Sequence, residues 1–234
     1  MNDMDTHDLD KLRCRQLEAL GRLMAGFTHE LKNHLAIIKE SNGLLADFVE
    51  MGMITDENLA DRIGKIVKTT TKRVGQAAEM AQHLNGFAHR MDTPLATFQV
   101  NEMIREELCF LDRFACLQQV ELKTSFLSDL PAIYNNPSLL QFILYCLFNK
   151  ALAALDAQGL MIIQTEAIDH AVHITLSMRG KGVTPADVVA DARMTDALSL
   201  AITMTGASLE EKTEAGVLSA LVLKIPSLKD EVSD

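Results

Sequence analysis

The chain has 234 residues, of which 48% are hydrophobic, and it carries a formal net charge of −10. This length suits one or two domains, and the hydrophobic content is sufficient for a buried core. The acidity argues against general nucleic-acid binding, because phosphates would be repelled. The sequence has neither a secretory signal pattern nor an apolar run of about 18 residues, which predicts a cytoplasmic protein without membrane insertion.

The first 93 residues contain no proline, and their apolar side chains recur at helical spacing. We predict two long helices, over residues 11–50 and 57–91, joined by a turn in which Asp56 caps the second helix. Neither helix can bury its apolar stripe alone, and two helices make only half a bundle. We therefore predict that residues 11–91 form a dimeric four-helix bundle with a second copy of the chain.

The first predicted helix carries a histidine away from its apolar stripe. That stripe consists of Leu20, Met24, Phe27, Leu31, Leu35 and Ile38. At about 100° per residue, His29 lies about 200° from both Phe27 and Leu31, so it should point to solvent. Glu30 follows it, and Asn33 lies one turn later on the same face. Helical position alone favours a surface histidine without a role, so the flanking residues decide the interpretation.

Those flanking residues form a recognisable pattern. Residues 21–26 read Gly-Arg-Leu-Met-Ala-Gly, and residues 29–35 read His-Glu-Leu-Lys-Asn-His-Leu. This segment resembles the phosphoacceptor box of bacterial sensor histidine kinases, which is His-Glu-Leu-x-Asn-Pro-Leu after a Gly-x-Leu-x-Ala-Gly lead. One residue departs from the pattern, because His34 stands where the family has proline. Without that proline the helix should be less kinked.

The resemblance assigns a role to each polar residue of the box. It implies that His29 is the phosphoacceptor and that Glu30 orients the imidazole or accepts its proton. It also implies that Asn33 can position a water molecule against the aspartyl phosphate of a partner. No metal site is expected, since His29 and His34 are five positions apart and do not share a helical face, whereas the His-Glu-x-x-His zinc pattern needs a separation of four.

Beyond Thr93-Pro94 the pattern becomes mixed, so we place domains at 1–93 and 94–227 and a polar tail at 228–234. We predict strands at residues 97–100, 120–126, 160–166, 171–178, 207–213 and 217–225. We predict helices at residues 101–118, 137–157 and 195–205, with Asn101 capping the first and Asn136 the second.

This order of elements resembles the ATP-binding domain of the same kinases. The implied fold class is α+β, with an N-terminal helical hairpin that forms a dimeric four-helix bundle. A degenerate histidine-kinase-type ATPase α/β sandwich follows. The degeneracy begins in the Asn box, Asn-Leu-Leu-x-Asn-Ala, which the family uses around magnesium and the phosphates. Here Tyr145 stands at its first asparagine, and Asn149 keeps the second.

Two further boxes of the family are altered. In the Asp-x-Gly-x-Gly box, Gly180 and Gly182 remain, but Met178 replaces the aspartate that would accept a hydrogen bond from the adenine amine. A thioether is only a weak acceptor, and losing this bond could cost about 1–3 kcal/mol. Residues 197–200 read Ala-Leu-Ser-Leu instead of Gly-Leu-Gly-Leu, so the backbone can no longer approach a phosphate closely. We expect no useful ATP binding, with Asn149, Gly180 and Gly182 as remnants.

These features predict a histidine phosphotransferase of a two-component phosphorelay. It would carry a phosphoryl group on His29 between response-regulator receiver domains, without ATP or another cofactor, and the receiver would supply the magnesium. One alternative is a response-regulator phosphatase or sequestering pseudokinase, in which Asn33 and Glu30 would matter most. A further alternative is an ATP-dependent sensor histidine kinase with divergent nucleotide boxes. Transfer from a phosphorylated receiver separates the first two functions, and ATP titration tests the third.

Overall fold

The structure, a computed structural model, describes residues 6–51, 59–91, 93–180 and 192–228. Two long helices come first, α1 (Thr6–Glu50) and α2 (Leu59–His89), as the sequence predicts. The expected cap at Asp56 lies outside the described residues. Contacts divide the chain into two compact units, which are Met24–Phe87 and the combination of Met1–Leu23 with Ala88–Asp234.

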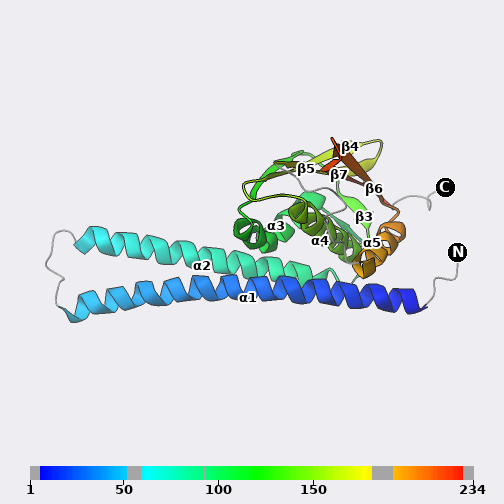
Figure 1. The fold of residues 1–234 in the computed structure, drawn as a ribbon. Helices are drawn as coiled ribbons and strands as arrows, with labels where there is room; N and C mark the ends of the chain where they lie inside the picture. The colour runs from blue at the N-terminus through cyan, green and yellow to red at the C-terminus, as the bar shows by residue number, and fades with distance from the viewer. Residues whose placement is uncertain (1–5, 52–58, 92, 181–191, 229–234) are drawn as a thin grey trace. The chain divides into compact units, whose positions relative to one another are not determined.

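The first unit, Met24–Phe87, is a helical hairpin made of most of α1 and most of α2 (Figure 1). Its interior is lined by large apolar side chains, which include Phe27, Phe48, Leu59, Met80 and Phe87. The Arg62 guanidinium lies 4.5 Å from the centroid of the Phe48 ring and covers this interior at the end of the hairpin nearest the turn.

One expected member of the apolar stripe is placed differently. Leu35 is 52% exposed, whereas the adjacent His34 is only 4% exposed. A single hairpin therefore leaves Leu35 uncovered, and its burial in a dimeric bundle stays a prediction. The reason is that one partner helix covers only part of the apolar surface of α1, and α2 contributes Arg73 at His34. The position of the partner helix, which periodicity alone does not fix, decides between the two neighbours.

The second unit contains a five-stranded sheet in the order β2-β4-β5-β7-β6, with β2 and β4 parallel and the other neighbours antiparallel. Its strands are β2 (Glu121–Phe126), β4 (Leu160–Ile168), β5 (Ala171–Arg179), β6 (Ser208–Glu214) and β7 (Val217–Pro226). A separate antiparallel pair joins β1 (Ala96–Phe98) to β3 (Ile133–Asn135).

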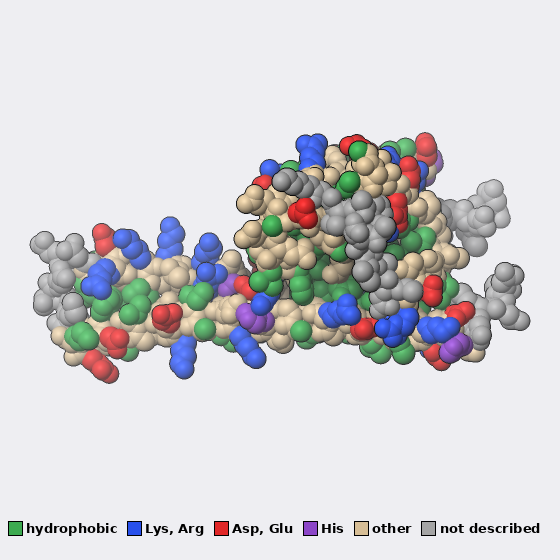
Figure 2. Space-filling view, viewed as in Figure 1, with side chains coloured by type: hydrophobic (Ala, Val, Ile, Leu, Met, Phe, Trp, Pro, Cys, Tyr) green, Lys and Arg blue, Asp and Glu red, His purple; other side chains and the backbone are tan. Residues whose placement is uncertain are grey.

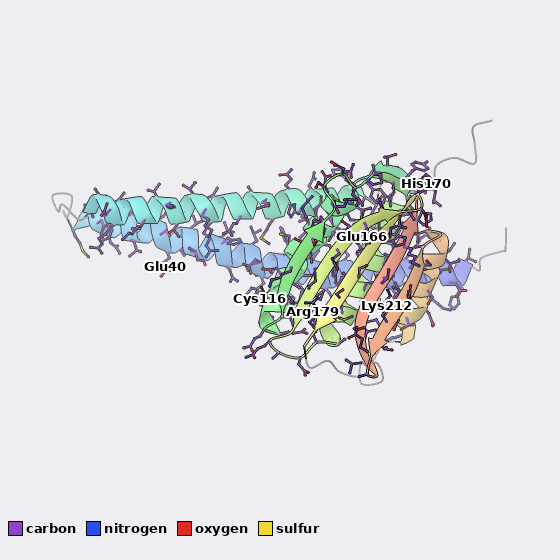
Figure 3. All side chains as sticks on the ribbon, turned by 90° about the horizontal axis from the view of Figure 1, so that it is seen from above. Glu40, Cys116, Glu166, His170, Arg179 and Lys212 are labelled. Atoms are coloured by element: carbon purple, nitrogen blue, oxygen red, sulfur yellow. The ribbon has the colours of Figure 1, made fainter. Side chains whose placement is uncertain are left out.

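Three helices cover one face of this sheet, namely α3 (Val100–Leu117), α4 (Pro137–Ala153) and α5 (Ala192–Met204). Burial alternates along β5, where Val172, Ile174, Leu176 and Met178 are buried. The intervening residues are partly exposed, as expected for a sheet with one covered face. Figure 3 looks onto the other face of the sheet, with Glu166, Arg179 and Lys212 labelled on its strands.

Helix α4 is the centre of this unit, and its start was predictable. The Asn136 side chain accepts a hydrogen bond from the backbone N–H of Leu139 at 2.9 Å, and Pro137 occupies the first turn. Every residue from Leu139 to Phe148 is buried. A helix that is apolar on all sides must lie inside the fold, and α4 packs against both α3 and α5.

Two predictions for this unit fail. The cap of α3 is Gln99, which makes no side-chain cap bond, and Asn101 lies inside the helix. The buried Asn101 amide instead donates to the Leu127 carbonyl at 2.8 Å, and its oxygen accepts from the Thr165 hydroxyl at 2.8 Å. These partners are 26 and 64 residues away, so local sequence cannot reveal them. In addition, the sequence pattern predicts no strand at residues 133–135, where the structure has β3.

A carboxyl group is buried where α3 meets α4. Glu107 is 0% exposed, and its two carboxylate oxygens have no hydrogen-bond partner among the described residues. Burial raises the pKa of Glu107 to about 8, and the nearby Gln141 amide and Arg90 guanidinium oppose this rise only in part. The Gln141 amide nitrogen does not complete a hydrogen bond of normal geometry, since it too is unpaired. At neutral pH the group is therefore mostly protonated.

The observed fold is α+β, with an N-terminal helical hairpin followed by an α/β sandwich. This part of the fold prediction is confirmed. None of the helices in the described part of the chain combines the length and the apolar character that crossing a membrane requires.

Candidate functional site

The candidate phosphoacceptor, His29, lies on α1 within the hairpin unit and is exposed, as predicted. Asn33, one turn later, is exposed on the same side. The Asn33 amide nitrogen lies 3.2 Å from Nδ1 of His29. The other ring nitrogen, Nε2, is the atom left for a reacting partner.

The third predicted residue, Glu30, is partly buried, and its two oxygens have different neighbours. Its Oε2 accepts a hydrogen bond from the Asn33 amide at 3.4 Å, and its Oε1 lies 3.9 Å from Nε2 of His34. Within the described chain, the hydrogen bonds of His29 and of Glu30 meet at Asn33 instead of joining the two side chains directly. The structure thus brings all three predicted residues together, with the asparagine between the acid and the imidazole.

Sequence reasoning assigned neither His34 nor Arg73 to this cluster. Arg73 on α2 donates from Nη1 toward Nδ1 of the buried His34 at 3.5 Å, and it also donates to Oε1 of Gln76 at 3.1 Å. The departure from proline at His34 was the available signal. The partner on α2 could not be inferred, because the register between two helices depends on side-chain packing along both of them.

The altered nucleotide boxes lie in the α/β unit, and each contains a replacing residue whose side chain is buried. The replacing residues Tyr145, Met178 and Ala197 are 4%, 7% and 5% exposed, respectively. Burial raises the pKa of the Tyr145 phenol, although the Arg22 guanidinium, which is hydrogen-bonded to it, opposes the rise. All three side chains are therefore part of the packed interior, where they add apolar contacts and offer little to a polar ligand.

Two residues that these boxes retain, Asn149 and Gly180, have structural roles. The Asn149 amide donates to the Tyr145 carbonyl at 2.7 Å, which is a bond within α4. Gly180 has a φ of 152°, and a Cβ there would lie 3.2 Å from the Cα of Gly159. The chain path therefore requires a glycine at this position whether or not a phosphate binds. Gly182 lies outside the described residues.

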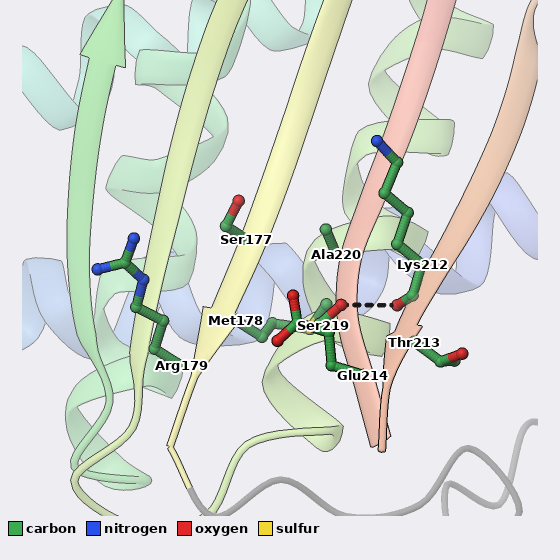
Figure 4. Close-up of a pocket in the computed structure, with 8 residues that line it drawn as sticks. All are labelled: Ser177, Met178, Arg179, Lys212, Thr213, Glu214, Ser219 and Ala220. Atoms are coloured by element: carbon green, nitrogen blue, oxygen red, sulfur yellow. Dashed lines mark hydrogen bonds between the residues drawn. The ribbon is translucent and has the colours of Figure 1, made fainter. Parts of the chain in front are cut away.

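A hollow of about 540 Å³ lies beside Met178 at the ends of β5, β6 and β7 (Figure 4). Charged side chains at its edge are Arg179, Lys212 and Glu214. Ser177 and Arg179 alternate with the buried Met178 along β5, so they face away from the helices. The hollow therefore opens on the uncovered face of the sheet, and Met178 of the altered Asp-x-Gly-x-Gly box also lines it. Among the described residues, no group of three or more His, Cys, Asp or Glu side chains could hold a metal ion.

In comparisons with known proteins, the chain is similar in sequence to bacterial kinases. No protein-family model matches it. It is 28% identical over 178 residues to the sensor histidine kinase ZraS of Salmonella typhimurium, covering 74% of this chain and 36% of ZraS. It is 23% identical over 173 residues to sporulation kinase E of Bacillus subtilis, covering 71% of this chain and 21% of that kinase.

Among solved structures, histidine kinase ThkA in complex with the response regulator protein TrrA is similar, with a TM-score of 0.47 and 16% identity over 97% of this chain and 68% of ThkA. The chain spans about a third or less of the length of the two curated relatives. Over roughly three quarters of its own length, the chain is similar in sequence to a sensor histidine kinase and to a sporulation kinase, so it is histidine-kinase-like.

Proposed function

We propose that this protein transfers phosphoryl groups through His29 and exchanges them with the receiver domains of response regulators. The observation that carries the proposal is an exposed imidazole on α1 whose Nδ1 contacts the Asn33 amide, in a chain whose sequence is similar to a sensor histidine kinase. Glu30 is near enough to contact the same amide.

The proposed chemistry is an in-line displacement at phosphorus. A lone pair on a ring nitrogen of His29 forms the N–P bond while the P–O bond of the receiver's aspartyl phosphate breaks, and the aspartate leaves as a carboxylate. The receiver's magnesium stabilises charge on the phosphoryl oxygens. This chain needs to supply the nucleophile, its orientation and a docking surface. Mixing it with a phosphorylated receiver and following the label on both proteins tests the proposal.

We further propose that the phosphoryl group comes from a receiver and not from ATP. The support is that each of the three nucleotide boxes holds a buried replacing side chain, namely Tyr145, Met178 or Ala197, although Ser199 of the third box is exposed. An ATP-dependent kinase is the second candidate. It is favoured by the similarity to ZraS and sporulation kinase E, both of which are named kinases.

We expect calorimetric titration with magnesium and ATP to give no measurable binding at ATP concentrations up to about 1 mM. The physical reason is that Met178 is only a weak acceptor for the adenine hydrogen bond and that Tyr145 replaces the asparagine that the family uses around magnesium. Titration with magnesium alone is the control. Submillimolar affinity, or label appearing on His29 from ATP, would establish the kinase instead.

We also expect a homodimer through the hairpin. Apolar side chains remain on the hairpin surface (Figure 2), with Leu35, Val67 and Val74 at 52%, 49% and 51% exposed. Changing both Val67 and Val74 to glutamate should convert the dimer to a monomer in sedimentation at micromolar concentration. The reason is that dimerisation would bury the new charges between the two hairpins. Glutamates at Lys65 and Lys72, which lie on a different face of α2, should leave the dimer intact. A wild-type monomer would contradict this architecture.

A further inference from the structure

His34 is a buried polar residue that the proposed transfer does not use. Its side chain is 5% exposed, although it lies one turn beyond the half-exposed Glu30 on α1. A buried imidazole is stable only when its polar atoms have partners. Its two nitrogens face two different charged groups, the Arg73 guanidinium at Nδ1 and the Glu30 carboxylate at Nε2.

These neighbours assign the proton on the His34 ring. Arg73 is always protonated and only donates, so Nδ1, at 3.5 Å from Nη1, must be an acceptor. The proton of the neutral ring then sits on Nε2, which faces Oε1 of Glu30 at 3.9 Å. That distance is too long for a hydrogen bond, and solvent screens the attraction in part, because the His34 side chain is 5% exposed but that of Glu30 is 37% exposed. His34 therefore restrains one oxygen of Glu30 on the inner side of the hairpin.

With one oxygen restrained, the other oxygen of Glu30 orients the Asn33 amide. Oε2 lies 3.4 Å from the amide nitrogen, which can donate to it. If the amide were turned by 180°, its oxygen would face the carboxylate, and two acceptors would repel each other. The position of Glu30 thus selects the orientation in which the Asn33 nitrogen also faces His29.

This orientation fixes the proton on His29. An amide nitrogen cannot accept, so Nδ1 of His29, at 3.2 Å, must be the acceptor and carries no proton. The proton of the neutral ring is then on Nε2, the exposed nitrogen. In that tautomer Nε2 has no lone pair for attack on phosphorus, and the nitrogen that has one is covered by Asn33.

We infer that His34 is a positioning residue that acts through Glu30 and Asn33 to hold His29 in a resting tautomer with its proton on Nε2. When Glu30 is released, its carboxylate or the oxygen of the turned Asn33 amide can accept a hydrogen bond from Nδ1–H of His29. The ring proton then sits on Nδ1, and Nε2 has a free lone pair. The tautomer assignment stands on the contacts alone. Its consequence for reaction rate rests on the proposed phosphoryl transfer.

The test is imidazole nitrogen NMR on the full-length protein, read together with the initial rate of phosphoryl uptake from a phosphorylated receiver. The wild type should show His29 protonated on Nε2. His34→Leu keeps the site apolar but removes both ring contacts, so the fraction of the Nδ1–H tautomer of His29 should rise and uptake should rise several-fold. His34→Gln can accept from Arg73 and donate toward Glu30, and it should restore the wild-type ratio.

Two further variants test the same contacts if His34→Leu does not fold. Asn33→Ala removes the donor to Nδ1 directly, and Arg73→Ala removes the group that fixes the His34 proton. Both should shift the His29 tautomer toward Nδ1–H. An unchanged tautomer in folded His34→Leu, or in both of these variants, overturns the inference. A shift toward the Nδ1–H tautomer without phosphoryl uptake in any variant supports the inference and counts against the proposed function.

Discussion

His29→Gln should abolish uptake of the phosphoryl group from a phosphorylated receiver domain while leaving the hairpin folded. Glutamine is polar and of similar size, but it has no nucleophilic ring nitrogen. The imidazole is exposed, so its removal opens no cavity and should change the free energy of unfolding by no more than about 0.5 kcal/mol. The measurement is acid-labile label on this chain after mixing, together with its circular dichroism.

His170→Asn is the matched control for that experiment. His170 is also exposed, in the turn between β4 and β5, and its φ of 63° is a conformation that asparagine tolerates. This variant should take up label like the wild type. If the His29→Gln protein is still labelled, or if the control loses its label, the phosphoacceptor is another residue.

Glu107→Gln should stabilise the α/β unit by several kcal/mol at pH 8 and by little at pH 5. The pKa of Glu107 is about 8 in the folded chain against an ordinary value of 4.5. Between these values the folded state binds more protons than the unfolded state, so stability falls as pH rises and the loss is complete above about pH 8. At about 1.4 kcal/mol for each pH unit of the gap, the penalty above pH 8 is on the order of 3–5 kcal/mol. Glutamine avoids this penalty because it stays neutral.

Urea unfolding at the two pH values measures this difference. Other groups also titrate over the range, so the informative quantity is the stability of the variant minus that of the wild type at each pH. Glu102→Gln on the same helix is the control, since Glu102 is exposed and its substitution should give nearly the same difference at both values. A pH-independent effect of Glu107→Gln would mean that the carboxyl is ionised in the fold.

Features with a local cause were predictable from the sequence. The exposure of His29 follows from helical periodicity, and the start of α4 follows from Asn136 beside Pro137. The strands β4, β5 and β7 have long alternating or apolar runs and lie close to their predicted positions. In each case the deciding residues are neighbours in the sequence.

Features with distant causes were not predictable. Asn101 resembles a helix cap, but its partners are a carbonyl and a hydroxyl in other elements. Strand β3 has only three residues, too few for a periodic signal, and exists because β1 pairs with it. The burial of His34 depends on which residue of α2 comes opposite. Each of these depends on packing between segments that the one-dimensional pattern does not place together.

The strand order of the sheet has a consequence for how the chain is made. Strand β7 is the last strand of the described chain to be synthesised, yet it lies between β5 and β6 in the sheet. Until it emerges from the ribosome, β5 lacks one neighbour, β6 has none, and the Asn135 amide lacks its bond to the Pro226 carbonyl. The nascent α/β unit therefore presents open strand edges that invite pairing with other chains. A ribosome that stalls before Val217 would release an aggregation-prone product, even though every helix of this unit had already been translated.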